Sequence, residues 1–267
     1  MKGARSLLVT SVAMLALVFA KETFGVPLRT VNAVSDGAIG TTGGGLRDSI
    51  RAVEPLTSEV LPSPGYSAPS GDETFVRMNA SELRMRILQG ARGTYIGDVL
   101  AARDSAITRW PDRVRRPLRV WVATPVQLVG WTPDFTSAVF EAFQAWVDVG
   151  VPVRFDFVPD SLSADVHVRF SASFPNGISG KTVWSRDRDW WLVATEIELA
   201  VTRSNGVLIT TPQLRAIAMH EVGHLLGLDH SSDSGDVMAE RVHVRELSDA
   251  DRLTARLIYS VPAGSLR

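Results

Sequence analysis

The sequence predicts an α/β fold for residues 117–267, in which a twisted, mixed β-sheet with an antiparallel edge strand is combined with helices. Two patterns carry this prediction. Alternating apolar and polar residues indicate three strands, at 118–123, 153–158 and 165–170. Apolar residues spaced three to four apart indicate helices, and the first of these begins with Thr132 as its cap and Pro133 in its first turn.

The second half of this region continues with a hairpin and two more helices. The hairpin has strands at 182–185 and 192–201 and a turn at 186–189. Thr211-Pro212 is predicted to start the next helix, with the threonine as its cap. Further on, Ser248 and Asp251 have the spacing of a capping box and predict a C-terminal helix that runs to Tyr259.

Eleven residues from His220 to His230 read His-Glu-Val-Gly-His-Leu-Leu-Gly-Leu-Asp-His. His220 and His224 are four residues apart, so on a helix they share one face and can hold one metal ion. Glu221 would face the open side of that metal, where it can accept a proton from an activated water. Gly227 offers the left-handed conformation that ends a helix, so that His230 approaches from outside it. Three neutral imidazoles and one water make an open, catalytic zinc site.

The alternative interpretation is an ordinary amphipathic helix with two surface histidines. Three of the five histidines in the chain fall within these eleven residues, and Gly227 and His230 stand at fixed offsets, which favours the metal site. Met238 follows the third histidine by eight residues. Considered alone, it would be interpreted as a core or loop methionine.

The histidine pattern resembles H-E-x-x-H-x-x-G-x-x-H, the zinc-binding signature of the metzincin peptidases. Met238 is similar to the methionine of their Met-turn, which packs beneath the zinc ligands. Ser231, directly after the third histidine, and the Leu-Ser-x-x-Asp opening of the last helix resemble the matrixin branch. The resemblance covers residues 117 to 260. It implies a zincin-like α+β fold and a secreted zinc-dependent endopeptidase that acts on protein or peptide substrates, with Glu221 as general base.

Several positions depart from the matrixin pattern. Residues 171–181 contain no histidine, whereas matrixins usually bind a second, structural zinc there, so we expect one zinc per chain. His167 lies within a strand pattern and is interpreted as facing solvent or a neighbour, and His243 as a surface residue, although it could also line the substrate cleft. Calcium is left unassigned, because three candidate carboxylates are interpreted as solvated loop or strand-edge residues: Asp160, Asp165 and Asp187.

The chain contains no cysteine. This excludes disulfides, thiolate metal sites, a thiol nucleophile and a lipoprotein anchor. It also excludes the cysteine that keeps matrixins latent by binding the zinc. After Met238 the chain reads Ala-Glu-Arg-Val and lacks the Pro-x-Tyr that shapes the specificity pocket of familiar matrixins, so the substrate preference stays open.

The N-terminal part is predicted to consist of three segments. Residues 1–20 begin with basic residues and continue with a short apolar run, which predicts a signal peptide cleaved after Ala20 or at a later site near Gly25; an uncleaved anchor is the alternative. Residues 21–72 are rich in proline and glycine and predict a flexible arm. Residues 73–116 predict a helical N-terminal extension or pro-segment, whose last helix covers 96–110 and ends before a proline.

Composition limits the partners of this chain. The net charge is −1, so nothing indicates a nucleic-acid or anionic-membrane partner. The signal segment predicts a secreted or extracytoplasmic protein without stable membrane association after cleavage, and we expect a monomer. Two other functions remain open: a catalytically silent zinc-binding interaction domain on the same fold, and a zinc hydrolase of non-peptide substrates. Loss of Glu221 or of a ligand would mark the silent domain, and all of these residues are present.

Overall fold

The computed structural model describes residues 50–52, 56–58 and 78–267. The predicted signal segment, 1–20, lies outside the described residues, as does most of the predicted arm. No helix in the described part of the chain is long and apolar enough to cross a membrane.

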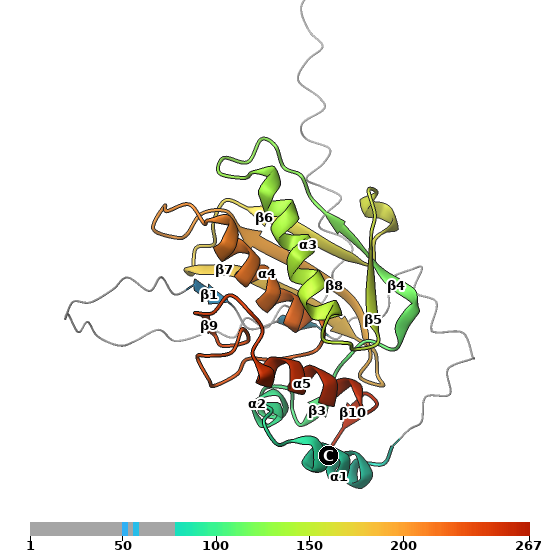
Figure 1. Ribbon diagram of the computed structural model, residues 1–267. Helices are drawn as coiled ribbons and strands as arrows, with labels where there is room; N and C mark the ends of the chain where they lie inside the picture. Colours follow the sequence, from blue (N-terminus) through green and yellow to red (C-terminus); the bar gives the residue numbers. More distant parts are fainter. Residues whose placement is uncertain (1–49, 53–55, 59–77) are drawn as a thin grey trace, which may run out of the picture. The chain divides into compact units, whose positions relative to one another are not determined.

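A mixed sheet of eight strands forms the centre of the fold (Figure 1). In chain order its strands are β1 (Ile50–Ala52), β2 (Leu56–Ser58), β4 (Arg113–Val122), β5 (Val153–Phe157), β6 (Val166–Ser171), β7 (Ile178–Arg186), β8 (Leu192–Ala200) and β9 (Arg241–Val242). Their order across the sheet is β5-β4-β6-β8-β7-β1-β9, and β2 also pairs with β7. β5, β4, β6 and β8 are mutually parallel, whereas β7 is antiparallel to β8. The predicted mixed sheet with its antiparallel strand is therefore confirmed.

Two short segments of the predicted arm form strands on the outer side of β7. β1 and β2 both run parallel to β7, and β1 is also antiparallel to β9. The sequence does not predict these strands. The backbone groups along a sheet edge can pair with any extended chain, whatever its side chains, so a segment rich in proline and glycine nearby can still be recruited.

Two helices pack together on one face of the sheet (Figure 1). They are α3 (Pro133–Val147) and α4 (Thr211–Leu225). Thr132 is the cap of α3, as predicted, whereas the cap of α4 is Thr210, one residue before the predicted threonine. Trp146 joins the two helices, because its indole Nε1 donates a hydrogen bond of 2.8 Å to the carbonyl of Met219.

The C-terminal helix has the predicted start. α5 (Asp249–Tyr259) is capped by Ser248, whose hydroxyl accepts a bond of 2.9 Å from the backbone N–H of Asp251, while the Asp251 carboxylate accepts one of 2.8 Å from the N–H of Ser248. The last residues form β10 (Gly264–Ser265).

The segment before β4 belongs to the same core as the sheet. It contains α1 (Ala80–Gly90), α2 (Ile96–Ala102) and β3 (Ala106–Ile107), and β3 pairs with β10. The predicted helix over 96–110 is wrong at its end: α2 stops at Ala102, and Asp104 and Ser105 have positive φ angles of 55° and 60°. The apolar residues beyond Ala102 are buried in the common core from extended chain, so their spacing mimics a helical stripe.

Candidate metal centre

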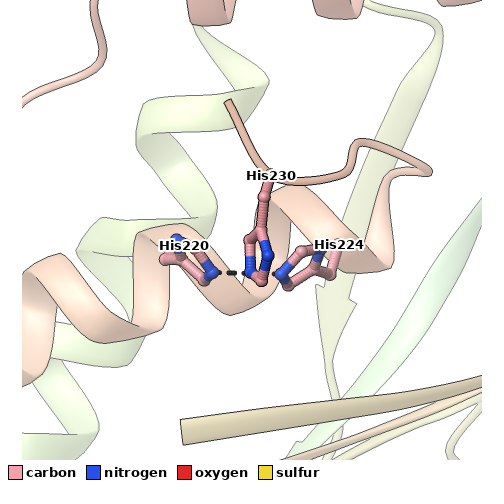
Figure 2. A group of neighbouring side chains, drawn as sticks. All are labelled: His220, His224 and His230. Atoms are coloured by element: carbon pink, nitrogen blue, oxygen red, sulfur yellow. Dashed lines mark hydrogen bonds between the residues drawn. The ribbon is translucent and has the colours of Figure 1, made fainter. Parts of the chain in front are cut away.

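Three imidazoles converge at the end of α4 (Figure 2). His220 and His224 are both on α4, and their Nε2 atoms lie 3.0 Å apart. His230 reaches the same point from the loop that follows the helix, as the sequence predicts. One ligand atom from each of the three residues lies within 4.8 Å of the other two, so a single ion can contact all three.

Backbone carbonyls determine which nitrogen of each helical histidine faces the site. Nδ1 of His220 donates a hydrogen bond of 2.8 Å to the carbonyl of Val237, and Nδ1 of His224 donates one of 3.1 Å to the carbonyl of Leu228. Nε2 is thereby left as the metal-facing atom in both rings. Burial lowers the pKa of His220 to about 3, and burial also holds the pKa of His224 well below its usual value. Both rings are therefore neutral near pH 7, the form that binds a metal.

Glu221 follows the first ligand and faces strand β7. The hydroxyl of Thr182 donates 2.7 Å to Oε2 of Glu221 and lies 3.0 Å from its backbone carbonyl, to which it can also donate. Oε1 is buried and has no hydrogen-bond partner among the described residues. Gly180 makes room for the carboxylate, because a Cβ at that position would lie 2.4 Å from Oε1. Burial raises the pKa of Glu221 to about 8, although the Thr182 bond opposes this.

The loop between the second and third histidines starts at Gly227, as predicted. Its φ is +98°, the N–H of Gly227 bonds the carbonyl of His224, and the N–H of Leu228 bonds that of Gly223. These bonds form a Schellman motif, the usual way for glycine to end a helix. A Cβ at Gly227 would also lie 2.1 Å from the carbonyl oxygen of Thr108, in the segment that precedes β4. Glycine is therefore required here for two separate reasons.

Met238 packs against α4 at Gly223, between the two helical histidines. A Cβ on Gly223, between the two helical ligands, would lie 2.2 Å from Sδ of Met238. The turn that carries Met238 is held by α5, because the Asp251 carboxylate accepts a bond of 2.9 Å from the N–H of Val237. The same Val237 presents its carbonyl to His220, so α5 supports a ligand through this turn.

The other candidate residues have local partners. Nε2 of His167 lies 2.9 Å from the carbonyl of Ser161, and its ring packs on Trp121, while His243 is exposed. Asp165 pairs with Arg119 at 2.8 Å. Asp160 and Asp187 accept bonds from backbone N–H groups of their own loops. These contacts agree with the interpretation of His167 and the three aspartates as local structure, and the exposure of His243 agrees with its interpretation as a surface residue.

Several residues of the site were not predicted. Gly180 and Thr182 position Glu221 from a different part of the chain, and Trp110 donates 2.8 Å to the carbonyl of Leu225 near the end of α4. Asp251 was interpreted only as a capping residue, although it also holds the Met-turn. No local pattern marks these roles, because each depends on which segments the fold brings together.

A helix-borne pair of histidines, a third histidine after a glycine turn, a nearby methionine and a glutamate beside the first histidine together form a candidate metal centre with the metzincin spacing. Residues 171–260 match the sequence model of the family described as Matrixin, which spans β7, β8, α4, the Met-turn and α5. This part of the chain is therefore similar to the matrixin family.

Curated relatives agree with this family. The chain is 31% identical to Metalloendoproteinase 1 of Glycine max over 137 residues, which are 44% of this chain and 44% of that protein. It is 32% identical to Metalloendoproteinase 1-MMP of Arabidopsis thaliana over 117 residues, 40% of this chain and 32% of that protein. It is 29% identical to Matrix metalloproteinase-15 of Homo sapiens over 166 residues, 57% of this chain and 22% of that protein. The chain thus spans less than half the length of these relatives.

Proposed function

We propose that this chain is a secreted zinc-dependent endopeptidase that hydrolyses protein or peptide substrates, with Glu221 as general base. One observation carries the proposal: two imidazoles held in the metal-binding form converge with a third beside a buried glutamate. The site lies next to a strand whose outer edge pairs with extended chain.

The donor set fits zinc. Three neutral imidazole nitrogens suit this ion, and a set of three protein ligands leaves one position open for water or substrate. The hydrogen bonds from the two Nδ1 atoms orient the rings and make Nε2 a better donor. When bound, zinc supplies a Lewis acid that polarises the scissile carbonyl and makes water more acidic. We propose one zinc per chain, held by His220, His224 and His230.

Glu221 moves the proton. Its Oε2 is held by Thr182, which leaves Oε1 available to accept a proton from water and to return it to the leaving amine. Burial alone raises the pKa of this carboxyl group, whereas a divalent cation beside it lowers that pKa again. The carboxylate form needed for the first proton transfer is thus favoured by the same ion that the histidines bind.

The outer edge of β7 supports an extended polypeptide as substrate. β1 and β2 pair with this edge, and their partners, Gly180 and Val183, lie on either side of Thr182, the residue that bonds Glu221. A substrate segment paired in the same way would present its peptide bonds at the level of Glu221, with main-chain bonds holding it in place. Recognition through the main chain favours cleavage inside many different sequences.

Secretion is the part of the proposal that concerns residues 1–20. Their basic start and short apolar run support export and removal of the segment. Protein recovered outside the producing cell should begin near Lys21. Exported protein that retains Met1 would contradict this and support an anchor.

The peptidase proposal is tested by incubating residues 21–267, loaded with zinc, with a peptide library from a denatured protein and identifying the cut sites by mass spectrometry. We expect internal cuts that stop after zinc is removed by a chelator and return when zinc is added. The matched control is Glu221→Gln, which keeps the shape and an oxygen for Thr182 but cannot accept the proton. It should retain zinc and lose roughly 10²–10⁴-fold in turnover.

Two results would contradict the proposal. Cleavage that persists in the chelated protein would show that the metal is not needed. A wild-type chain that holds one zinc and cuts nothing in the library would favour the silent zinc-binding domain instead.

A further inference from the structure

A buried arginine from the segment before β4 lies against the loop that carries the third ligand. Arg103 directly follows α2, and its side chain is only 2% exposed. Its Nε donates a hydrogen bond of 3.0 Å to Oδ2 of Asp229, and its Nη2 donates one of 2.7 Å to the carbonyl of Leu228. These two acceptors are the two residues that immediately precede His230.

Both acceptors also bond metal ligands. The carbonyl of Leu228 accepts from Nδ1 of His224, so this one oxygen receives bonds from the arginine and from a ligand ring. Oδ1 of Asp229 accepts 2.8 Å from the backbone N–H of His230. The guanidinium is therefore one hydrogen-bonded group away from two of the three ligands.

We propose that Arg103 is a positioning residue of the metal centre, which fixes the Leu228–His230 loop so that His224 and His230 face the same ion. The loop has no regular secondary structure, and Arg103 joins its carbonyl and its carboxylate with one rigid group. Without it, the Leu228 carbonyl could turn away from His224, and the Asp229 carboxylate would be left as a buried charge with a side-chain exposure of 7%.

The shape of the arginine matters as well as its charge. The guanidinium stacks on the ring of Trp184 in β7, with Cζ 4.4 Å from the ring centroid. The planar guanidinium can stack on this ring and donate hydrogen bonds to two acceptors at the same time, whereas the compact ammonium group of a lysine has no planar face to stack. Arg103 thus connects the segment before β4, the strand beside the site and the ligand loop.

The inference rests on the proposed zinc site but not on peptide hydrolysis, so its test measures zinc binding. Zinc affinity of residues 21–267 is measured by competition with a chromophoric chelator for wild type, Arg103→Met and Arg103→Lys. The visible spectrum of the cobalt-substituted protein reports the ligand geometry. We expect Arg103→Met to lose about 10–100-fold in zinc affinity, the usual effect of removing a residue that orients a ligand. Arg103→Lys should recover part of this loss, and both variants should alter the cobalt spectrum.

Arg109 provides a matched control from the same segment. Its Nε donates a hydrogen bond of 2.8 Å to the carbonyl of Val261, and its guanidinium stacks on Trp191 and Tyr259, so these contacts resemble those of Arg103 but go to groups other than Leu228 and Asp229. Arg109→Met should lower stability without changing zinc affinity or the cobalt spectrum.

Each result decides the inference. Wild-type zinc affinity in Arg103→Met, or an equal loss in Arg103→Met and Arg109→Met, overturns it in favour of a general structural role. If Arg103→Met does not fold, Arg103→Lys is compared with Arg109→Lys, and equal affinities overturn it. A wild-type chain that binds no zinc overturns the proposed function itself, which is a different failure.

Discussion

Burial and two carbonyl groups decide how the ligand histidines behave. A histidine exposed to water would be partly protonated at neutral pH and free to present either nitrogen. Here burial depresses the pKa of both helical rings, and the carbonyls of Val237 and Leu228 accept from Nδ1. The site is therefore preorganised for a metal before the metal binds, which limits the cost of assembling it.

Removal of one ligand should empty the site. His224→Ala leaves two imidazoles, which bind zinc far more weakly than three. Elemental analysis after dialysis should find one zinc per wild-type chain and close to none in the variant. Two tightly bound zinc ions in the wild type would contradict the proposed stoichiometry, and full zinc occupancy in the variant would show that His224 is not a ligand.

Gly180 should be required for activity although it carries no functional group. In Gly180→Ala the new Cβ would lie 2.4 Å from Oε1 of Glu221 and 2.8 Å from Cγ2 of Ile217. The carboxylate must move, so we expect kcat to fall at least about tenfold, since misplacement of a catalytic group by 1 Å can cost 10²-fold. Zinc content should stay at the wild-type level. Gly97→Ala, where nothing lies within 4 Å of the added Cβ, is the control and should keep wild-type kcat.

At the scale of residues, the sequence predicts the candidate metal-binding and catalytic side chains but not the residues that position them. The His-Glu-x-x-His spacing alone places three side chains on one helix, because helix geometry is local. Glu221 is held by Gly180 and Thr182, which come from a strand about forty residues earlier in the chain. Their contact with Glu221 follows from the packing of α4 on the sheet, which no short sequence pattern encodes.

At the scale of elements, periodicity predicts those strands and helices that present one continuous face to the core. The strands β4 to β8 and the helices α3, α4 and α5 all overlap the predicted ranges, although β4 and β7 begin about five residues earlier than predicted. Periodicity fails where burial comes from extended chain, as after α2, and where a strand forms only by pairing with an edge, as in β1, β2 and β9. In those segments the backbone supplies the interaction, and the side-chain pattern carries little of the signal.

The turn that ends α4 offers a test of its two requirements for glycine. Gly150 has a similar φ, +86° against +98° at Gly227, but nothing lies within 4 Å of its added Cβ. Gly150→Ala should lower the free energy of unfolding by about 1–2 kcal/mol, the cost of a left-handed alanine. Gly227→Ala should lower it by roughly 1–3 kcal/mol more, because the Cβ also meets the Thr108 carbonyl.

Urea unfolding of the metal-free proteins measures both changes, with zinc affinity measured in parallel. Gly227→Ala should also bind zinc more weakly, since the loop to His230 begins there, whereas Gly150→Ala should not. Equal destabilisation of the two variants would show that the Thr108 contact is relieved by movement elsewhere.

At the scale of the whole molecule, one part of the N-terminal region supports the helix that carries the site, whereas another part occupies the strand edge proposed for substrate. Residues 80–110 are built into the core and support α4 through Trp110, whose indole bonds the Leu225 carbonyl. β1 and β2, in contrast, pair along the edge of β7 where we propose that substrate binds. The sequence could not separate a structural extension from an inhibitory pro-segment, because apolar content alone is compatible with either.

The two roles predict opposite effects of shortening the chain. A chain that starts at Met78 lacks β1 and β2 but keeps the core, so it should remain folded and hydrolyse peptides faster than residues 21–267, since nothing competes for the edge of β7. A chain that starts at Arg116 also lacks α1, α2 and β3, with seven large buried apolar side chains: Leu83, Ile87, Tyr95, Ile96, Val99, Ile107 and Trp110. Loss of each large buried apolar side chain costs about 2–5 kcal/mol, against a total stability of about 5–15 kcal/mol. This shorter chain should be unfolded or insoluble.

Circular dichroism melts and initial rates on one peptide distinguish the possibilities, with the chain starting at Met78 as the reference for fold. If competition for the β7 edge is the cause of the higher rate, the gain should appear mainly as a lower KM, because an occupied edge blocks binding more than it alters the proton transfer. Equal rates for the chains starting at 21 and at 78 would show that β1 and β2 do not compete with substrate. A chain starting at Arg116 that is soluble, melts cooperatively and is the most active of the three would show that residues 78–115 are a removable pro-segment, and would contradict the structural role assigned to Arg103 and Trp110.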